Sequence, residues 1–247
     1  METLEGLDTR LLVDLLRDRV SPSKSLGQHY LVDDEVIERS IHLTEEFDCP
    51  LSRSSHVLEV GPGPGSLTLA LLRSESTVTA IEIDKQSVEH LRRVFRESAQ
   101  YLTIDEADAV SGRWPKGITH VISNLPYQIS SPIIDRITKY HSSVPIQLSI
   151  LLVQEEFAHR MAMSSAPYDI GPLGLNLWLD FDVFPRQEGL TKLIQPIPAR
   201  AIQDCRPKAG KQARGRRDKQ AAVQNNHQTL LLEQEEENED TTIKTTV

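Results

Sequence analysis

The sequence has little cysteine and few aromatic residues. Of its 247 residues only two are cysteine, Cys49 and Cys205, and 5% are aromatic. Two cysteines so far apart do not have the spacing of a disulfide framework or a zinc site. The chain also has no run of about eighteen apolar residues, the length that a membrane-spanning helix needs. We therefore expect two reduced, unpaired thiols and no membrane partner.

The N-terminus lacks the features of a targeting signal. Residues 1–5 read Met-Glu-Thr-Leu-Glu. They have neither the basic start and apolar core of a secretory signal nor the Arg- and Ser-rich composition of a transit peptide. This composition predicts a cytoplasmic protein, or a nuclear one where the cell has a nucleus.

Positive charge is in the minority and is concentrated near the C-terminus. The formal net charge is -9, which argues mildly against binding to nucleic acid, although an acidic protein can carry a local basic patch. Residues 206–219 are rich in Lys and Arg, and an acidic run follows at 233–240. A segment with so few apolar residues cannot offset its ordering entropy by burial. We expect residues 205–247 to form a disordered charged tail, either solvated or in contact with RNA.

The rest of the chain alternates strand-like and helix-like segments. Apolar and β-branched runs predict strands at 56–60, 77–83, 101–104, 119–123, 146–153 and 175–184. Helical spacing of apolar residues predicts helices at 66–73, 85–97, 132–140 and 154–163. This alternation predicts a mostly parallel α/β sheet with helices on both faces. We place an N-terminal helix in residues 1–20, the sheet domain in 21–187 and a remnant of a C-terminal domain in 188–204.

The first predicted strand ends in a loop of glycines and prolines. Gly61, Gly63 and Gly65 follow Val60 at alternate positions. Glycines between a strand and a helix let the backbone turn sharply and approach a ligand closely. The G-x-G-x-G spacing differs from the dinucleotide pattern G-x-G-x-x-G, and taken alone it also fits an ordinary tight turn. We interpret Gly61 and Gly63 as candidate cofactor contacts.

Acidic residues follow the second and third predicted strands. Glu82 ends the second, where a carboxylate can accept hydrogen bonds from both hydroxyls of a ribose, as in NAD and S-adenosylmethionine sites. Asp108 follows the third and could accept a hydrogen bond from an adenine amino group, although an isolated Asp also fits a turn or a helix cap. Ligands of parallel sheets bind outside the carboxyl ends of the strands, so both side chains are expected near the glycine loop.

The fourth predicted strand ends in the most specific motif, Asn124-Leu125-Pro126-Tyr127. An adenine amino nitrogen is a poor nucleophile because its lone pair is delocalised into the ring. The Asn124 side chain and a main-chain carbonyl at Leu125 or Pro126 could accept its hydrogens and aim the lone pair at a methyl donor. Pro126 fixes the turn, and Tyr127 offers a ring for stacking on an unpaired base. A sulfonium donor is already activated, so we predict no metal. The plainer alternative is a turn in which Asn caps and Tyr packs.

Taken in order, these motifs resemble those of the ribosomal RNA adenine N6-dimethyltransferase family, in a form similar to its archaeal and eukaryotic members. Lys24–Leu31 resembles the segment that covers the cofactor in that family, and Gln154–Met161 resembles a later family helix. The resemblance extends over about residues 20–184. It implies a Rossmann-like, S-adenosylmethionine-dependent methyltransferase fold. The cofactor contacts that it implies are His29, Leu31, Gly61, Glu82, Asp108 and Asn124.

The resemblance further implies a substrate and a partner. Members of the family transfer two methyl groups to each of two adjacent adenosines near the end of small-subunit ribosomal RNA. The expected partner is therefore an immature small ribosomal subunit, the expected process is ribosome biogenesis, and we expect the protein to act as a monomer.

The resemblance weakens after residue 184. The family's Tyr-x-Arg-Leu-Ser segment has its nearest counterpart in Tyr168–Gly174, which lacks the Arg. Only Gln195–Arg200 stands where the family has a proline-rich segment and a helical domain that helps to hold RNA. Glu155 stands where the family has Lys, which removes a positive charge. We therefore expect a reduced C-terminal appendage and altered docking on the ribosome.

Two other functions fit parts of the sequence. The acidic charge and the reduced C-terminal region also suit a catalytically weak RNA-binding assembly or transcription factor with the same fold. A methyltransferase for a protein glutamine amide would have a related Asn/Asp-Pro-Pro-Tyr site, but Leu125 stands where those enzymes tend to have Pro. The combination of motifs favours the RNA adenine dimethyltransferase over both.

Overall fold

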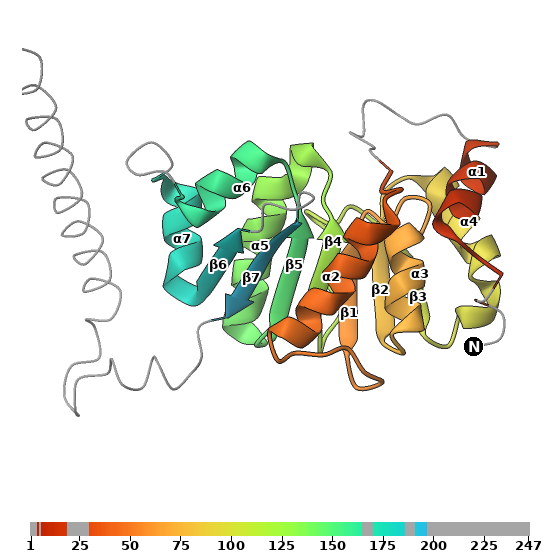
Figure 1. Ribbon diagram of the computed structural model, residues 1–247, viewed down its shortest axis with the longest axis horizontal. Helices are drawn as coiled ribbons and strands as arrows, with labels where there is room; N and C mark the ends of the chain where they lie inside the picture. Colours follow the sequence, from red (N-terminus) through yellow and green to blue (C-terminus); the bar gives the residue numbers. More distant parts are fainter. Residues whose placement is uncertain (1–3, 5, 19–29, 165–169, 186–190, 197–247) are drawn as a thin grey trace, which may run out of the picture.

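The fold is a seven-stranded sheet with helices on both faces (Figure 1). The computed structural model describes residues 4, 6–18, 30–164, 170–185 and 191–196. The strand order is β3-β2-β1-β4-β5-β7-β6. The strands are β1 (His56–Val60), β2 (Thr77–Glu82), β3 (Leu102–Glu106), β4 (His120–Asn124), β5 (Leu148–Leu152), β6 (Phe181–Pro185) and β7 (Thr191–Pro196). β1 to β5 pair in parallel, and β7 pairs antiparallel with β5 and β6. The prediction of a mostly parallel α/β sheet is confirmed.

The helices form two layers. They are α1 (Thr9–Arg17), α2 (Asp34–Glu46), α3 (Ser66–Arg73), α4 (Lys85–Val94), α5 (Ser130–Ser143), α6 (Glu155–Ala162) and α7 (Pro172–Asp180), with short 3-10 turns η3 (Arg96–Ser98) and η4 (Tyr127–Ile129). One apolar cluster joins the sheet to α1, α2, α3 and α4, and another joins it to α5, α6 and α7. In the view of Figure 1, α2 crosses in front of the sheet and α5 lies behind it.

The alternation of side chains along the strands separates the two clusters. Val121 and Leu151 pack with α5 and α6, whereas their neighbours Ile122 and Ile150 pack with α2 and α3. All five residues of β5 are buried. This is the burial expected of a parallel strand covered on both faces, and it explains why its sequence is a continuous apolar run.

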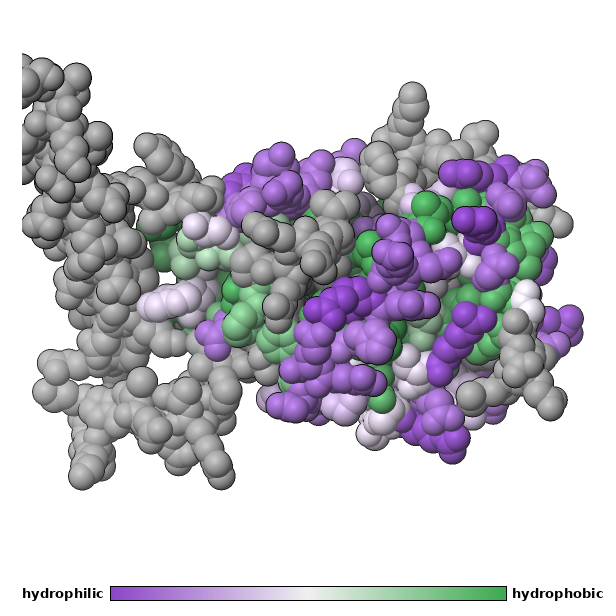
Figure 2. Space-filling model, in the orientation of Figure 1, coloured by the Kyte–Doolittle hydropathy of each residue, from purple (hydrophilic) through white to green (hydrophobic). Residues whose placement is uncertain are grey.

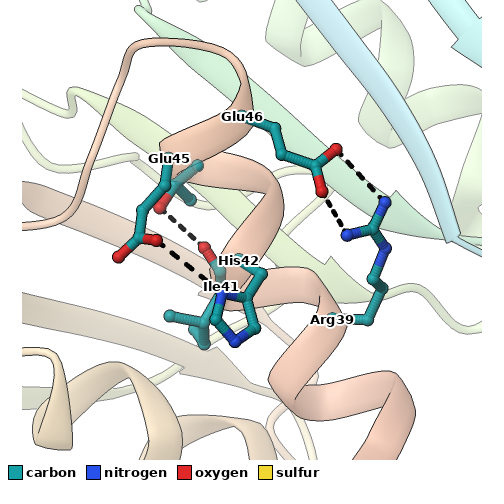
Figure 3. A network of polar contacts seen from close by, with 6 residues as sticks. Arg39, Ile41, His42, Glu45 and Glu46 are labelled. Carbon is teal, nitrogen blue, oxygen red and sulfur yellow. Dashed lines mark hydrogen bonds and ion pairs between the residues drawn. The ribbon is translucent and has the colours of Figure 1, made fainter.

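The outer face of α2 is hydrophilic, as the purple surface in the middle of Figure 2 shows. Figure 3 shows its ion pairs: Arg39 pairs with Glu46, and His42 with Glu45. All four side chains are well exposed, and exposed pairs contribute little to stability. The helix is therefore held mainly by its buried side, which includes Leu43.

The structure corrects the sequence prediction in one segment. The strand predicted at 175–184 is wrong for residues 175–180, which lie in α7, and only β6 is extended. Leu173, Leu175, Leu177 and Leu179 alternate like a half-buried strand, but Pro172 occupies the first turn of a helix, where its missing N–H costs nothing.

Two elements were not predicted, α2 and β7. The sheet extends past residue 187, where the sequence suggested that the domain ends, because β7 pairs with β5 over Leu152↔Thr191 to Ser149↔Ile194. The predicted N-terminal helix corresponds to α1. The tail predicted at 205–247 lies outside the described residues. Within the described ranges, no helix is both long and apolar enough to cross a membrane.

Gly65 lets the start of α3 pack closely against α4. Its φ is 93°, in the left-handed region. A Cβ atom there would lie 2.6 Å from Phe95 Cε2 and 2.9 Å from Leu91 Cδ2. Both the backbone conformation and the packing therefore require glycine.

We predict that Gly65→Ala lowers the free energy of unfolding by roughly 2–4 kcal/mol, because it combines left-handed strain with overpacking. Gly117→Ala is the matched control: Gly117 has a φ of 75°, but nothing lies within 4 Å of its Cβ position. That variant should lose only the strain, roughly 1–2 kcal/mol. Urea unfolding of both variants measures the difference. Equal losses would contradict the packing argument.

Candidate functional site

A pocket opens at the carboxyl ends of β1, β2 and β4 and beside the segment that follows β3. This is where ligands of parallel sheets bind, since the strand order reverses between β1 and β4. Nine of the residues singled out from the sequence line it: Leu31, Gly61, Gly63, Glu82, Asp108, Asn124, Leu125, Pro126 and Tyr127. The tenth, His29, lies outside the described residues.

The glycine loop is held against β2 and against the loop after β4. Gly61 N donates to Ile81 O at 2.9 Å. Gly61 and Gly63 have φ values of 68° and 54°, which favour glycine. A Cβ on Gly61 would come within 3.3 Å of Pro126 Cγ, and one on Gly63 within 3.4 Å of Tyr30 Cδ1. The absence of side chains therefore keeps main chain, rather than methyl groups, at the wall of the pocket.

Glu82 is a buried carboxylate that closes the glycine loop. Its Oε2 accepts a hydrogen bond from Gly63 N at 3.2 Å, and its Oε1 accepts one from Asp84 N at 2.9 Å. Burial raises its pKa, and the two main-chain N–H groups oppose that shift. Each carboxylate oxygen has a second lone pair, so Glu82 can accept further hydrogen bonds from a ligand in the pocket.

Asp108 lies at a turn and lines the pocket as well. Its Oδ1 accepts from Val110 N at 2.8 Å and its Oδ2 from Ser111 Oγ at 2.7 Å. The hydrogen bond from Ser111 is the largest of the effects that lower the pKa of Asp108, and the one from Val110 adds to it. The turn and the ligand-binding interpretations are therefore compatible, because the turn holds an ionised acceptor at the pocket.

The loop after β4 has one main-chain acceptor already in use. Pro126 O accepts hydrogen bonds from Ile129 N at 3.1 Å and from Ser130 Oγ at 3.2 Å. Of the two carbonyls that the sequence suggested, the geometry therefore favours Leu125. The side chain of Leu125 is buried, and its N–H donates to Leu152 O at 3.1 Å, which fixes the start of the loop on β5. Tyr127, 40% exposed, stands at the edge of the pocket.

A side-chain hydrogen bond joins the two strands from which these loops emerge. β1 and β4 pair at Val57↔His120 and Leu58↔Val121. Farther along, Val60 N donates to Ser123 Oγ at 2.8 Å, and both groups are buried. The strands therefore remain connected where the pocket opens between them.

Sequence reasoning assigned no role to several lining residues, of which Glu59 is the most unusual. Glu59 is buried in β1, where its Oε2 accepts a hydrogen bond from Thr68 Oγ1 at 2.6 Å. Burial raises its pKa to about 8. The signal was available, since an acidic residue within a buried parallel strand is unusual. Tyr30, which belongs to the segment expected to cover the cofactor but was not singled out, also lines the pocket, as does the exposed Ile83.

A family model and two similar curated proteins have related descriptions. The sequence model described as "Ribosomal RNA adenine dimethylase" matches residues 20–187. A Haloarcula marismortui protein named "Probable ribosomal RNA small subunit methyltransferase A" is 44% identical over 151 residues, which are 60% of this chain and 50% of that protein. A Methanopyrus kandleri protein of the same name is 34% identical over 185 residues, 74% of this chain and 59% of that one. The chain thus spans only about half the length of the curated relatives it matches.

The fold has solved counterparts as well. The crystal structure of a dimethyladenosine transferase from Plasmodium falciparum superposes with a TM-score of 0.60 at 24% identity, covering 70% of this chain and 66% of that one. At this identity the similarity shows the fold alone, a Rossmann-like α/β sheet.

We predict that the burial of Glu59 makes stability fall as pH rises. Between its ordinary pKa of 4.5 and its raised pKa of about 8, the unfolded chain has lost this proton while the folded protein keeps it. The unfolding free energy therefore decreases through that window, by about 1.4 kcal/mol per pH unit from this group. Glu59→Gln removes the effect. The unfolding free energy of the variant minus that of the unaltered protein should therefore rise from about pH 5 to about pH 8.

Urea unfolding at several pH values measures this difference. Glu82 is present in both proteins, so the effect of its own burial is common to them, and its charge adds to the effect of burial in raising the pKa of Glu59. Glu106→Gln, which changes an exposed carboxylate at the end of β3, is the control and should show no such growth. A difference for Glu59→Gln that stays constant with pH would contradict the assignment of a buried, protonated acid.

Proposed function

Because the chain belongs to the ribosomal RNA adenine dimethylase family, we propose that it transfers methyl groups from S-adenosylmethionine to the N6 amino group of adenosine in small-subunit ribosomal RNA. One observation carries the proposal. The glycine loop, Glu82, Asp108 and the Asn124-Leu125-Pro126-Tyr127 loop, which are separated in sequence, line one pocket. The names of the relatives, which refer to small-subunit ribosomal RNA, support the substrate class.

The pocket fits S-adenosylmethionine, the cofactor of this family. The glycine loop presents main chain where a Cβ would meet Pro126 or Tyr30. Glu82 provides acceptors for the two hydroxyls of a ribose, and Asp108 provides one for an adenine amino group. Ile83 is an exposed apolar side chain at the same wall and suits contact with a flat ring. Leu31 also lines the pocket, from the segment that precedes α2.

The chemistry of the chain's own residues is positioning. When bound, the cofactor supplies a methyl group that is already activated on a sulfonium. The Asn124 side chain and the Leu125 carbonyl accept the two amino hydrogens of the target adenine. These hydrogen bonds pull the nitrogen toward tetrahedral geometry and direct its lone pair. Tyr127 stacks on a base that has left its helix, and Pro126 keeps the carbonyl and the ring in fixed relation.

The preferred substrate is an immature small ribosomal subunit, and the preferred product carries two methyl groups on each modified adenosine. Both follow from the family and are part of the proposal. The same pocket can add a second methyl group because monomethylation leaves one amino hydrogen for Asn124 or Leu125 to accept. A monomer suffices, since one chain provides all the residues of the pocket named above.

We predict that Asn124→Ala lowers the rate of methyl transfer by roughly 10²–10³, the usual loss for removing a preorganised hydrogen-bonding group. The assay is transfer to small ribosomal subunits from a strain that lacks the modification, with mass spectrometry of the digested RNA. Asn176→Ala, on the exposed side of α7, is the control and should retain full activity. If the unaltered protein yields no dimethyladenosine although it binds the cofactor, the RNA-binding factor becomes the better function.

We also predict that Glu82→Gln weakens cofactor binding about tenfold or more, because a charged acceptor of ribose hydroxyls becomes a neutral amide. Isothermal titration calorimetry with S-adenosylmethionine measures the affinity. Glu106→Gln is a matched control: Glu106 pairs with Glu82 across β2 and β3 but does not line the pocket. Unchanged affinity of Glu82→Gln would remove Glu82 from the cofactor site.

A further inference from the structure

Arg136 connects α5 to the segment that carries Asp108. Its Nη1 donates hydrogen bonds to Ala109 O at 3.0 Å and to Val110 O at 2.6 Å. These are the two residues directly after Asp108. Hydrogen bonds from a charged donor to main-chain carbonyls are stronger than neutral ones, and here the donor is half-buried. The main chain is therefore held on both sides of Asp108: Ala107 N donates to Glu82 O of β2 at 3.0 Å, and Arg136 holds Ala109 and Val110 from α5.

Trp114 reinforces this attachment. The Arg136 guanidinium lies over its ring, with Cζ 4.8 Å from the ring centroid. Trp114 Nε1 donates to Ala109 O at 2.9 Å, so Ala109 O accepts from both side chains. The ring is buried and packs against Tyr140 of α5, 5.9 Å between centroids. The flat guanidinium fills a place that a lysine ammonium cannot fill in the same way.

The segment held in this way is a turn that begins at a pocket residue, Asp108. Asp108 accepts hydrogen bonds from Val110 N and Ser111 Oγ within the turn. Val110 is thus held at both of its main-chain groups, its N–H by Asp108 and its carbonyl by Arg136. A shift of Ala109 and Val110 would therefore displace the Asp108 carboxylate relative to Glu82 on β2.

α5 also begins at the loop that would hold the target base. Ser130, its first residue, donates to Pro126 O at 3.2 Å. Arg136 is on the same helix. One helix therefore forms hydrogen bonds with both the Asn124 loop and the Asp108 turn, the two parts of the pocket assigned to the target base and to the adenine of the cofactor.

We propose that Arg136 is a positioning residue for cofactor recognition, which holds Asp108 where it accepts a hydrogen bond from the adenine amino group of the cofactor. The proposal rests on the function proposed above. Arg136 does not line the pocket; it acts through the main chain of Ala109 and Val110, and its positive charge also helps to lower the pKa of Asp108. Its removal should weaken selection for the adenine amino group in particular, rather than binding in general.

The test compares two ligands that differ only at that amino group. S-adenosylhomocysteine carries it, and the analogue with unsubstituted purine in place of adenine has a hydrogen atom there, which leaves ring nitrogen N1 unchanged and offers Asp108 no N–H donor. Calorimetry with the full chain gives the ratio of their affinities. We expect the unaltered protein to prefer the adenosyl ligand and Arg136→Met to reduce that preference about tenfold, the ratio that 1.4 kcal/mol represents. Arg136→Lys should be intermediate, because it keeps the charge without the flat, forked donor.

Lys139→Met is the matched control. Lys139 is exposed on the same helix, so the variant also removes one positive charge from α5. It should keep the full preference. The double variant Arg136→Met with Asp108→Ala should show no greater loss of preference than Asp108→Ala alone, because both act through one hydrogen bond.

The results separate the inference from its premise. If the unaltered protein prefers the adenosyl ligand and Arg136→Met keeps that preference, the inference is wrong and the proposed function stands. Equal weakening of both ligands by Arg136→Met would also overturn it, since that is what a purely structural residue would do. If the unaltered protein binds neither ligand, the premise fails and the inference fails with it.

Discussion

The hydrogen bond from Val60 N to Ser123 Oγ is the constraint on which the site depends. A pocket at the carboxyl edge needs β1 and β4 to part, yet parted strands leave main-chain groups without partners inside the protein. The Ser123 hydroxyl resolves the conflict. The main-chain pairing of β1 with β4 extends to Leu58↔Val121, and beyond it the hydroxyl accepts the hydrogen bond of Val60 N. The bond is buried, and an unsatisfied N–H in its place would be costly. The glycine loop and the Asn124 loop both start directly after it.

Three acidic side chains line this pocket, and the fold treats each differently. Glu59 is held by one hydroxyl and is driven toward its neutral form by burial. Glu82 is also buried but receives two main-chain N–H groups, which oppose that shift. Asp108 is ionised within a turn that lowers its pKa. The overall charge of -9 counted against a nucleic-acid substrate. Part of that formal charge lies on acids that line the pocket, so the net charge does not describe the rest of the surface.

Much of the sheet could be predicted from the sequence, because parallel strands leave a strong signal. Buried on both faces, β1, β2, β4 and β5 are rich in apolar and β-branched residues, and the predicted segments overlap all four. The motif loops also follow from sequence, since ligand residues must come at strand ends. The family resemblance is confirmed by the match over residues 20–187.

Most of the remaining features depend on tertiary contacts. α7 was mistaken for a strand because its alternate leucines fit a strand; Pro172 is the local signal for the start of a helix, and packing on α6 and β6 stabilises that helix. α2 buries Ser40 and Thr44 beside Ile37, so its inner face does not look apolar in the sequence. Arg136 was missed because its contacts with Ala109 and Trp114 exist only in the folded protein. Glu59 did leave a signal, an acidic residue within a buried strand, but its hydrogen bond with Thr68 depends on the fold.

The contact between Gly61 and Pro126 has a consequence for how this sequence can vary over time. A Cβ on Gly61 would lie 3.3 Å from Pro126 Cγ, a contact tight enough that the proline would have to shift. The two positions lie in different motifs of the same pocket, yet a change at either alters what the other can accept. Mutations in the two loops are therefore expected to be epistatic, and a graft of one loop from a distant relative would need the other loop to accompany it. The two loops, although separate in the sequence, are therefore expected to change together during evolution.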